Sequence, residues 1–210
     1  MKTISYNKER VQNIILYFVE KKNSINFTYL SKLLYFSDMF NYIYRGNTIT
    51  DLKYTAQEIG PIPKRIYSEL VKKMKKKYKK YELYKIIDCK NIIGKNTVHN
   101  YSCFLNHNYK IDNYLIVKKN KKFNPIYFSP NELDTMDRVS KLFDTNQKIE
   151  NDELIYTKSQ PWKRTWAGGS GKGRTIEFNI ELDSCDDLLK NNTYAMIEKS
   201  KAAKSAVQEL

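Results

Sequence analysis

The chain has 210 residues, 41% apolar and 13% aromatic, which is enough for one packed domain and too apolar for a chain disordered throughout. Its three cysteines, Cys89, Cys103 and Cys185, share no metal-ligand spacing and are odd in number, which argues against a zinc module or a disulfide scaffold. Neither a secretory core nor an apolar run of about 18 residues is present, so we expect reduced thiols, no membrane span and a cytoplasmic location.

The net charge of +14 raises the question of an anionic partner. Most of the basic residues are lysine, and the chain is rich in Asn, Ile and Tyr but poor in Gly, Ala and Pro, as in a protein from an AT-rich genome. Proteins that read bases rely on arginine, so the charge is a weak sign of nucleic-acid binding. There are only six arginines: Arg10, Arg45, Arg65, Arg138, Arg164 and Arg174.

Two amphipathic helices open the chain. Apolar residues spaced three and four apart predict one helix from about Lys8 to Lys22 and a second, central one from about Thr28 to Tyr44. We expect Thr28 to cap the second helix and Gly46 to end it.

The segment from Gly60 to Pro63 holds one glycine and two prolines, so we predict a fixed turn there. Pro63 would occupy the first turn of a third helix, whose apolar positions are Ile66, Tyr67 and Leu70. This helix runs into the segment 72–80, where seven of nine residues are lysine.

Short apolar runs between Asn, Lys and Gly predict a strand-rich insertion at about 84–128. The expected strands lie at 86–87, 92–93, 101–105, 114–117 and 126–128. A helix over 130–144 should follow, because Ser129, Pro130 and Glu132 form a strong helix start.

The C-terminal part begins with an aromatic segment, Gln160–Trp166. Four of the seven glycines fall within 167–173, which predicts a flexible loop. Alternating Ile176, Phe178 and Ile180 predict a strand, and 188–210 should be helical. The expected fold is therefore α+β, mainly helical: a compact single domain with a small strand-rich insertion.

The sequence shows no catalytic apparatus. Its two histidines, His99 and His107, lie in polar surroundings away from any known nucleophile motif. Around Gly171 and Lys172 the phosphate-loop signature fails at both ends. We therefore expect no catalytic residue, metal or cofactor, although a site assembled from scattered residues stays open as a third class of function.

The lysine run has two interpretations. It is a candidate patch that binds an anionic partner. Alternatively, it is the solvated C-terminal end of a helix, where the helix dipole stabilises cations. The lysine bias of the whole chain favours the second. The residues concerned are Lys72, Lys73, Lys75, Lys76, Lys77, Lys79 and Lys80.

An ordered set of motifs resembles the Panacea domain, the family of SocA-like antitoxins and phage-associated relatives. Its parts are the helix 29–38, the Gly-Pro-Ile-Pro segment with the helix after it, the helix from Glu132 to Phe143, and Pro161-Trp162. Lys158, Ser159 and Gln160 stand where the family often has a histidine. The motif residues, each structural or partner-binding, are Lys32, Leu33, Tyr35, Phe36, Gly60, Pro61, Pro63, Tyr67 and Trp162.

The resemblance implies a Panacea-like domain at 1–166, followed by a glycine-rich loop (168–173) and a C-terminal strand and helix at 167–210. It also implies an antitoxin that binds and neutralises a cognate protein toxin encoded in the adjacent gene, as a type II pair. Some relatives deliver the toxin to a protease, so a protease is a further expected partner. The alternative function is a basic nucleic-acid-binding regulator.

Overall fold

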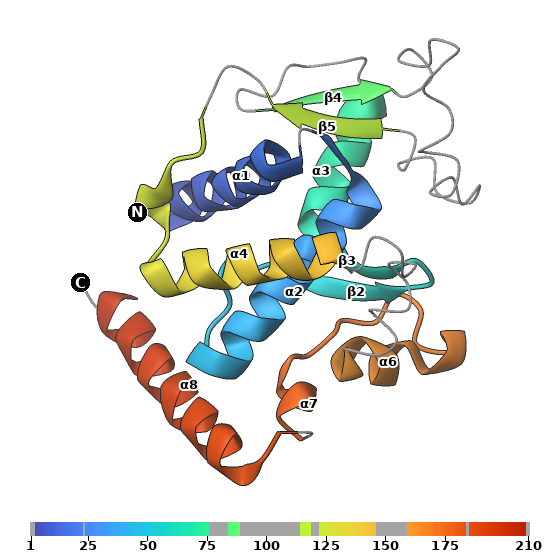
Figure 1. Cartoon of the computed structure of the whole chain (residues 1–210). Helices are drawn as coiled ribbons and strands as arrows, with labels where there is room; N and C mark the ends of the chain where they lie inside the picture. Colours follow the sequence, from blue (N-terminus) through green and yellow to red (C-terminus); the bar gives the residue numbers. More distant parts are fainter. Residues whose placement is uncertain are drawn as a thin grey trace. The chain divides into compact units, whose positions relative to one another are not determined.

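The computed structural model describes residues 3–22, 24–75, 84–88, 114–118, 122–145, 159–183 and 185–208. Helices dominate and the strands are short, which confirms the mainly helical α+β class (Figure 1). The chain divides into two compact units, Met1–Ser31 with Arg65–Tyr127 and Lys32–Lys64 with Phe128–Leu210. Within the described residues, no helix has the length and apolar character needed to cross a membrane.

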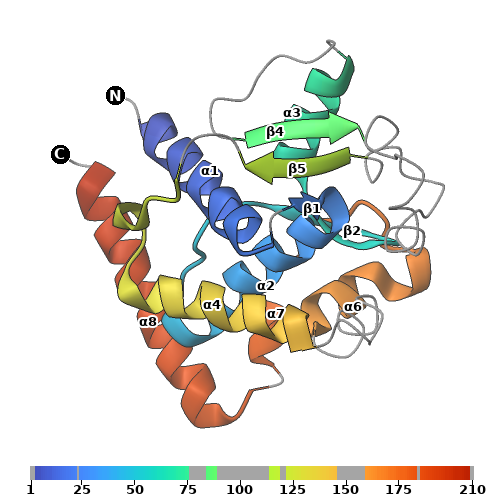
Figure 2. The ribbon, with the colours of Figure 1, turned by 45° about the horizontal axis from the view of Figure 1, so that its top comes forward.

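The first unit combines helices with a three-stranded antiparallel sheet. It holds α1 (Thr3–Lys22), β1 (Ser24–Asn26), most of α3 (Lys64–Lys75), β4 (Tyr84–Asp88), β5 (Tyr114–Lys118) and the 3-10 turn η5 (Pro125–Tyr127). The strand order is β1-β5-β4, and α1 packs against β1, β5 and η5 (Figure 2). The apolar face predicted for α1 is buried and includes Ile14, Ile15 and Phe18.

The predicted insertion is confirmed in part. The expected strands at 86–87 and 114–117 lie in β4 and β5, which pair with each other. The expected strands at 92–93 and 101–105 lie outside the described residues. A strand at 126–128 is wrong: Asn124 Oδ1 accepts a hydrogen bond from the Ile126 N–H at 3.1 Å, which holds the chain in a local turn.

The helix α2 spans Phe27–Arg45, close to the predicted bounds. Its cap is Asn26 rather than the expected Thr28, because Asn26 Oδ1 accepts a hydrogen bond from the Tyr29 N–H at 2.7 Å. Gly46 ends the helix as predicted. It has a φ of +72° and donates its N–H to the Tyr42 carbonyl at 2.8 Å.

The Gly60–Pro63 segment is a strand, so the predicted turn is wrong. It forms β3, paired antiparallel with β2 (Tyr54–Gln57). Ala56 and Tyr54, the residues opposite Pro61 and Pro63, direct their hydrogen bonds to the other side of β2, toward residues 173–176. The two prolines therefore occupy positions of β3 whose missing N–H groups are not needed for pairing. The prediction that Pro63 lies in the first turn of the third helix is also wrong, because Pro63 is the last residue of β3 and α3 begins at Lys64.

The helix α4 spans Pro130–Thr145 and confirms the predicted helix start. Glu132 Oε2 accepts from the Ser129 N–H at 2.8 Å, while the Glu132 N–H donates to Ser129 Oγ at 3.4 Å. This reciprocal capping box satisfies N–H groups that no helical carbonyl can reach. Met136, Val139 and Phe143 form the buried face of α4.

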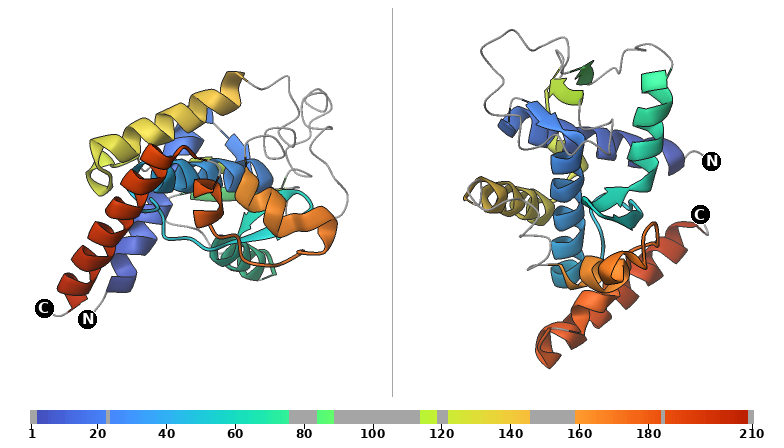
Figure 3. Two further views of the ribbon diagram at one scale, coloured as in Figure 1. Left: turned by 90° about the horizontal axis from the view of Figure 1, so that it is seen from below. Right: turned by 90° about the vertical axis from the view of Figure 1, so that its right-hand side faces the viewer.

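The C-terminal part adds α6 (Gln160–Trp166), the 3-10 turn η6 (Ala167–Gly169), α7 (Asn179–Leu182) and α8 (Asp187–Gln208). The strand predicted at 176–180 is wrong, because Ile176 is the last residue that pairs with β2 and Asn179 already begins α7. The helix predicted at 188–210 is confirmed as α8, which runs past the C-terminal end of α2 (Figure 3). Thr193 of α8 donates its hydroxyl to the Ile43 carbonyl.

Candidate partner-binding surface

The residues that carry the family resemblance lie mostly in the interior. Even Lys32 is only 3% exposed, and Tyr67 is half-buried with its ring 5.8 Å from the ring of Phe27. The others are buried: Leu33, Tyr35, Phe36, Gly60, Pro61, Pro63 and Trp162. Buried side chains cannot reach a partner unless the fold opens, so a contact surface has to be sought among other residues.

Asp38 is the centre of a buried polar cluster in the second unit. Its Oδ1 accepts hydrogen bonds from the backbone N–H groups of Ile49 and Thr50, both at 2.8 Å. Its Oδ2 accepts from the hydroxyls of Thr50 and Tyr54, the latter at 2.6 Å. Burial raises the pKa of Asp38 to about 6, although these hydrogen bonds oppose the rise. The cluster fixes residues 49–54 against α2.

A second buried contact joins α2 to α6. The hydroxyls of Tyr35 and Ser159 lie 2.6 Å apart, and Ser159 Oγ also accepts from the Trp162 N–H at 3.2 Å as the N-cap of α6. Trp162 Nε1 donates to the Gln57 carbonyl of β2 at 3.2 Å. Trp162 therefore anchors α6 to β2, because its large ring is fully buried and its indole N–H is satisfied.

The glycine-rich loop has a defined, hydrogen-bonded backbone. The Gly173 N–H donates to the Ala56 carbonyl at 2.7 Å, and the Ala56 N–H donates to the Arg174 carbonyl at 2.9 Å. Gly171 packs so closely on α6 that a Cβ would lie 1.6 Å from the Thr165 carbonyl oxygen. Residues 173–176 thereby extend the β2–β3 pair on its second side.

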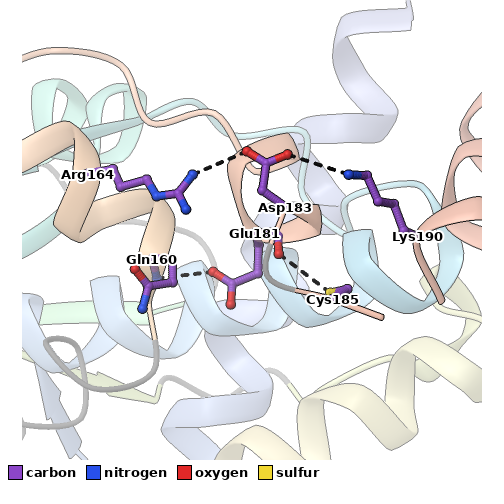
Figure 4. A network of polar contacts seen from close by, with 6 residues as sticks. All are labelled: Gln160, Arg164, Glu181, Asp183, Cys185 and Lys190. Carbon is purple, nitrogen blue, oxygen red and sulfur yellow. Dashed lines mark hydrogen bonds and ion pairs between the residues drawn. The ribbon is translucent and has the colours of Figure 1, made fainter. Parts of the chain in front are cut away.

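A polar network ties α6, α7 and the start of α8 together (Figure 4). Arg164 lies 3.2 Å from Asp183, whose other carboxylate oxygen is 4.0 Å from Lys190 Nζ. Glu181 Oε2 accepts from the Gln160 N–H at 3.1 Å. Burial raises the pKa of Glu181, against the effect of that hydrogen bond and of nearby Arg164. Arg164 and Lys190 therefore both pair with Asp183 inside the second unit.

Several sequence-predicted candidates fall outside what the structure describes. Lys76, Lys77, Lys79 and Lys80 lie outside the described residues, and for Lys72, Lys73 and Lys75 only the helical backbone of α3 is described. The two histidines, Cys89 and Cys103 are also outside. Cys185 is a free, half-buried thiol whose pKa is raised by burial.

A cleft of about 470 Å³ opens between the C-terminal end of α2 and α4, both in the second unit. Phe40 and Leu142 are half-buried, whereas Tyr44 is 57% exposed. Arg138 pairs with Asp134 at 2.9 Å, one turn away on α4. The lining residues are Phe40, Tyr44, Arg45, Asn131, Asp134, Thr135, Arg138 and Leu142.

Sequence reasoning missed this cleft. Its residues come from two helices far apart in the chain, and no local pattern places them together. One signal was available: Arg45 and Arg138 are two of only six arginines in a lysine-rich chain. Both are exposed, so neither arginine is needed to fill the core.

One of three comparisons with known proteins found a match, and it agrees with the motifs described above. No curated protein and no solved structure matches the chain. The family described as "Antitoxin SocA-like, Panacea domain" matches residues 30–163. This stretch begins within α2 and ends within α6, and it contains the buried Asp38 cluster and the Tyr35–Ser159 contact. The chain therefore belongs to the SocA-like antitoxin family with the Panacea domain.

Proposed function

We propose that this chain binds a protein toxin encoded in the adjacent gene and neutralises it as a stoichiometric complex. The family match over residues 30–163 carries the proposal. The buried state of the motif residues supports it, because a stable scaffold leaves its surface free for recognition. Neutralisation of this kind masks or restrains the toxin and needs no chemistry from the chain.

Co-expression tests this function. The adjacent reading frame is expressed alone, with this gene, and with a copy of the gene whose start codon is removed. We expect growth arrest in the first and third strains, rescue in the second, and a complex of fixed ratio on co-purification. A harmless neighbour that does not co-purify would overturn the proposal.

Delivery of the toxin to a protease would be a second step. The half-life of the toxin in the same strains distinguishes delivery from masking. If the chain only masks the toxin, the toxin half-life after translation is blocked stays the same or lengthens when the two are co-expressed. If the chain delivers the toxin to a protease, the half-life shortens and recovers in protease-deficient cells. We propose masking as the basic activity, since binding alone suffices for it.

Nucleic-acid binding is the competing function, motivated by the net charge of +14 and the lysine run 72–80. Such binding depends on phosphate contacts and weakens steeply as salt rises. A gel-shift titration on duplex DNA, including the promoter of the gene itself, tests it at two salt concentrations. Tight, salt-sensitive binding together with no effect on the neighbouring gene product would favour this function instead.

A further inference from the structure

The cleft between α2 and α4 combines an apolar wall with arginine at its rim. Tyr44 is a large aromatic side chain that is more than half exposed, beside half-buried Phe40 and Leu142. Covering apolar surface of this kind stabilises a complex by roughly 25 cal/mol per Å² of area removed from water. Aromatic residues and arginine are also the side chains that contribute most at protein interfaces.

The two arginines differ in their surroundings. Arg138 already pairs with Asp134 on its own helix. Arg45 is exposed, and among the described residues it makes no hydrogen bond or ion pair with its side chain. An arginine fork binds a carboxylate through two parallel hydrogen bonds, which a lysine cannot do. An incoming acidic side chain would therefore find its strongest attachment at Arg45.

From these observations we infer that the cleft lined by Phe40, Tyr44, Arg45 and Leu142 is the surface that holds the toxin. The inference rests on the proposed function and specifies which side chains of the toxin the cleft binds. The occupant is a segment of the toxin that carries an apolar side chain next to a carboxylate. The apolar group packs against Tyr44, Phe40 and Leu142, and the carboxylate pairs with Arg45. Asn131 and Thr135 line the same cleft and offer hydrogen-bonding groups to the segment's backbone.

The size of the cleft fits such a segment. About 470 Å³ lies within the range of pockets that accept a drug-sized ligand, which corresponds to a few side chains. Charge complementarity points the same way, because an acidic segment meets both the exposed Arg45 and a chain of net charge +14.

Two variants test the inference on the full chain, with the purified product of the adjacent gene as the probe. Arg45→Glu reverses the charge at the rim, and Tyr44→Ala removes the aromatic wall without changing charge. We expect each variant to weaken binding of the toxin by about tenfold or more, as for interface hot spots. The matched control is Arg174→Glu. Arg174 is also exposed and does not line the cleft, so this variant changes the net charge by the same amount as Arg45→Glu. It should stay within about threefold of the wild type, because a single charge far from an interface changes affinity little.

The outcomes separate the inference from the function on which it rests. If the wild-type chain fails to bind, the proposed function falls and the inference falls with it. If the wild type binds but either cleft variant binds equally well, the cleft is not the docking surface while the function stands. An equal loss in Arg174→Glu shows that net charge alone governs affinity and also overturns the inference. Thermal unfolding of each variant confirms that the losses do not come from misfolding.

Discussion

At the scale of single residues, the buried Asp38 makes the stability of the fold depend on pH. Its carboxylate is surrounded by hydrogen-bond donors of the same unit, and burial still raises its pKa to about 6. The ordinary value in an unfolded chain is about 4. Between these two values the folded chain binds more protons at this site than the unfolded chain does, so stability falls as the pH rises.

The replacement Asp38→Asn isolates this contribution. Asparagine keeps an acceptor for the N–H groups of Ile49 and Thr50 and does not titrate. The free energy of unfolding of the wild type minus that of the variant should fall by about 3 kcal/mol as the pH rises from about 3 to about 7, most steeply between the two pKa values, and should stay level above that range. Chemical denaturation at several pH values measures it. A difference that rises over this range would mean that the hydrogen bonds dominate over burial.

At the scale of elements, two glycines with nearly the same backbone conformation have different surroundings. Gly46 has a φ of +72° and Gly168 a φ of +65°. A Cβ on Gly46 would lie 2.5 Å from the Ile197 backbone nitrogen of α8, whereas nothing lies within 4 Å of a Cβ on Gly168. The close approach of α8 to the end of α2 therefore depends on the absence of a side chain at residue 46.

Alanine at each position separates backbone strain from this collision. Gly168→Ala should cost about 1 kcal/mol, the cost of a left-handed backbone for an L-residue. Gly46→Ala should cost on the order of 2–4 kcal/mol, because the backbone of α8 has to move as well. Denaturant unfolding of the two variants compares them. Equal losses would show that α8 is not held against residue 46 in solution.

Elements were predictable from sequence where their causes are local. Apolar spacing predicted α1 and α2, and the capping pattern of Ser129 and Glu132 predicted α4. The error at Gly60–Pro63 has a physical reason. This segment owes its strand conformation to β2, and pairing between strands leaves no signature in a short window of sequence. The cleft between α2 and α4 could not be predicted because its two helices lie far apart in the chain.

At the scale of the whole molecule, the net charge of +14 is a property of the long-range field. A positive field would attract an acidic partner, as proposed here for the toxin, and speed the encounter, and salt screens such a field. The association rate should therefore fall by about tenfold between roughly 0.02 and 0.5 M salt, while the dissociation rate changes much less. Stopped-flow mixing with the toxin measures both. A rate independent of salt would show that the charge plays no part in the encounter.

The contacts made by Ser159 and Trp162 join residues separated by more than 100 positions, since they reach Tyr35 and Gln57. Synthesis proceeds from the N-terminus, so Tyr35 is made long before Ser159, and the contact between their hydroxyls cannot form until Ser159 has left the ribosome. A chain cut short before Ser159 would present an unsatisfied hydroxyl and an uncovered β2 edge to the cell's quality control. The second unit can therefore be completed only after translation has passed Trp162.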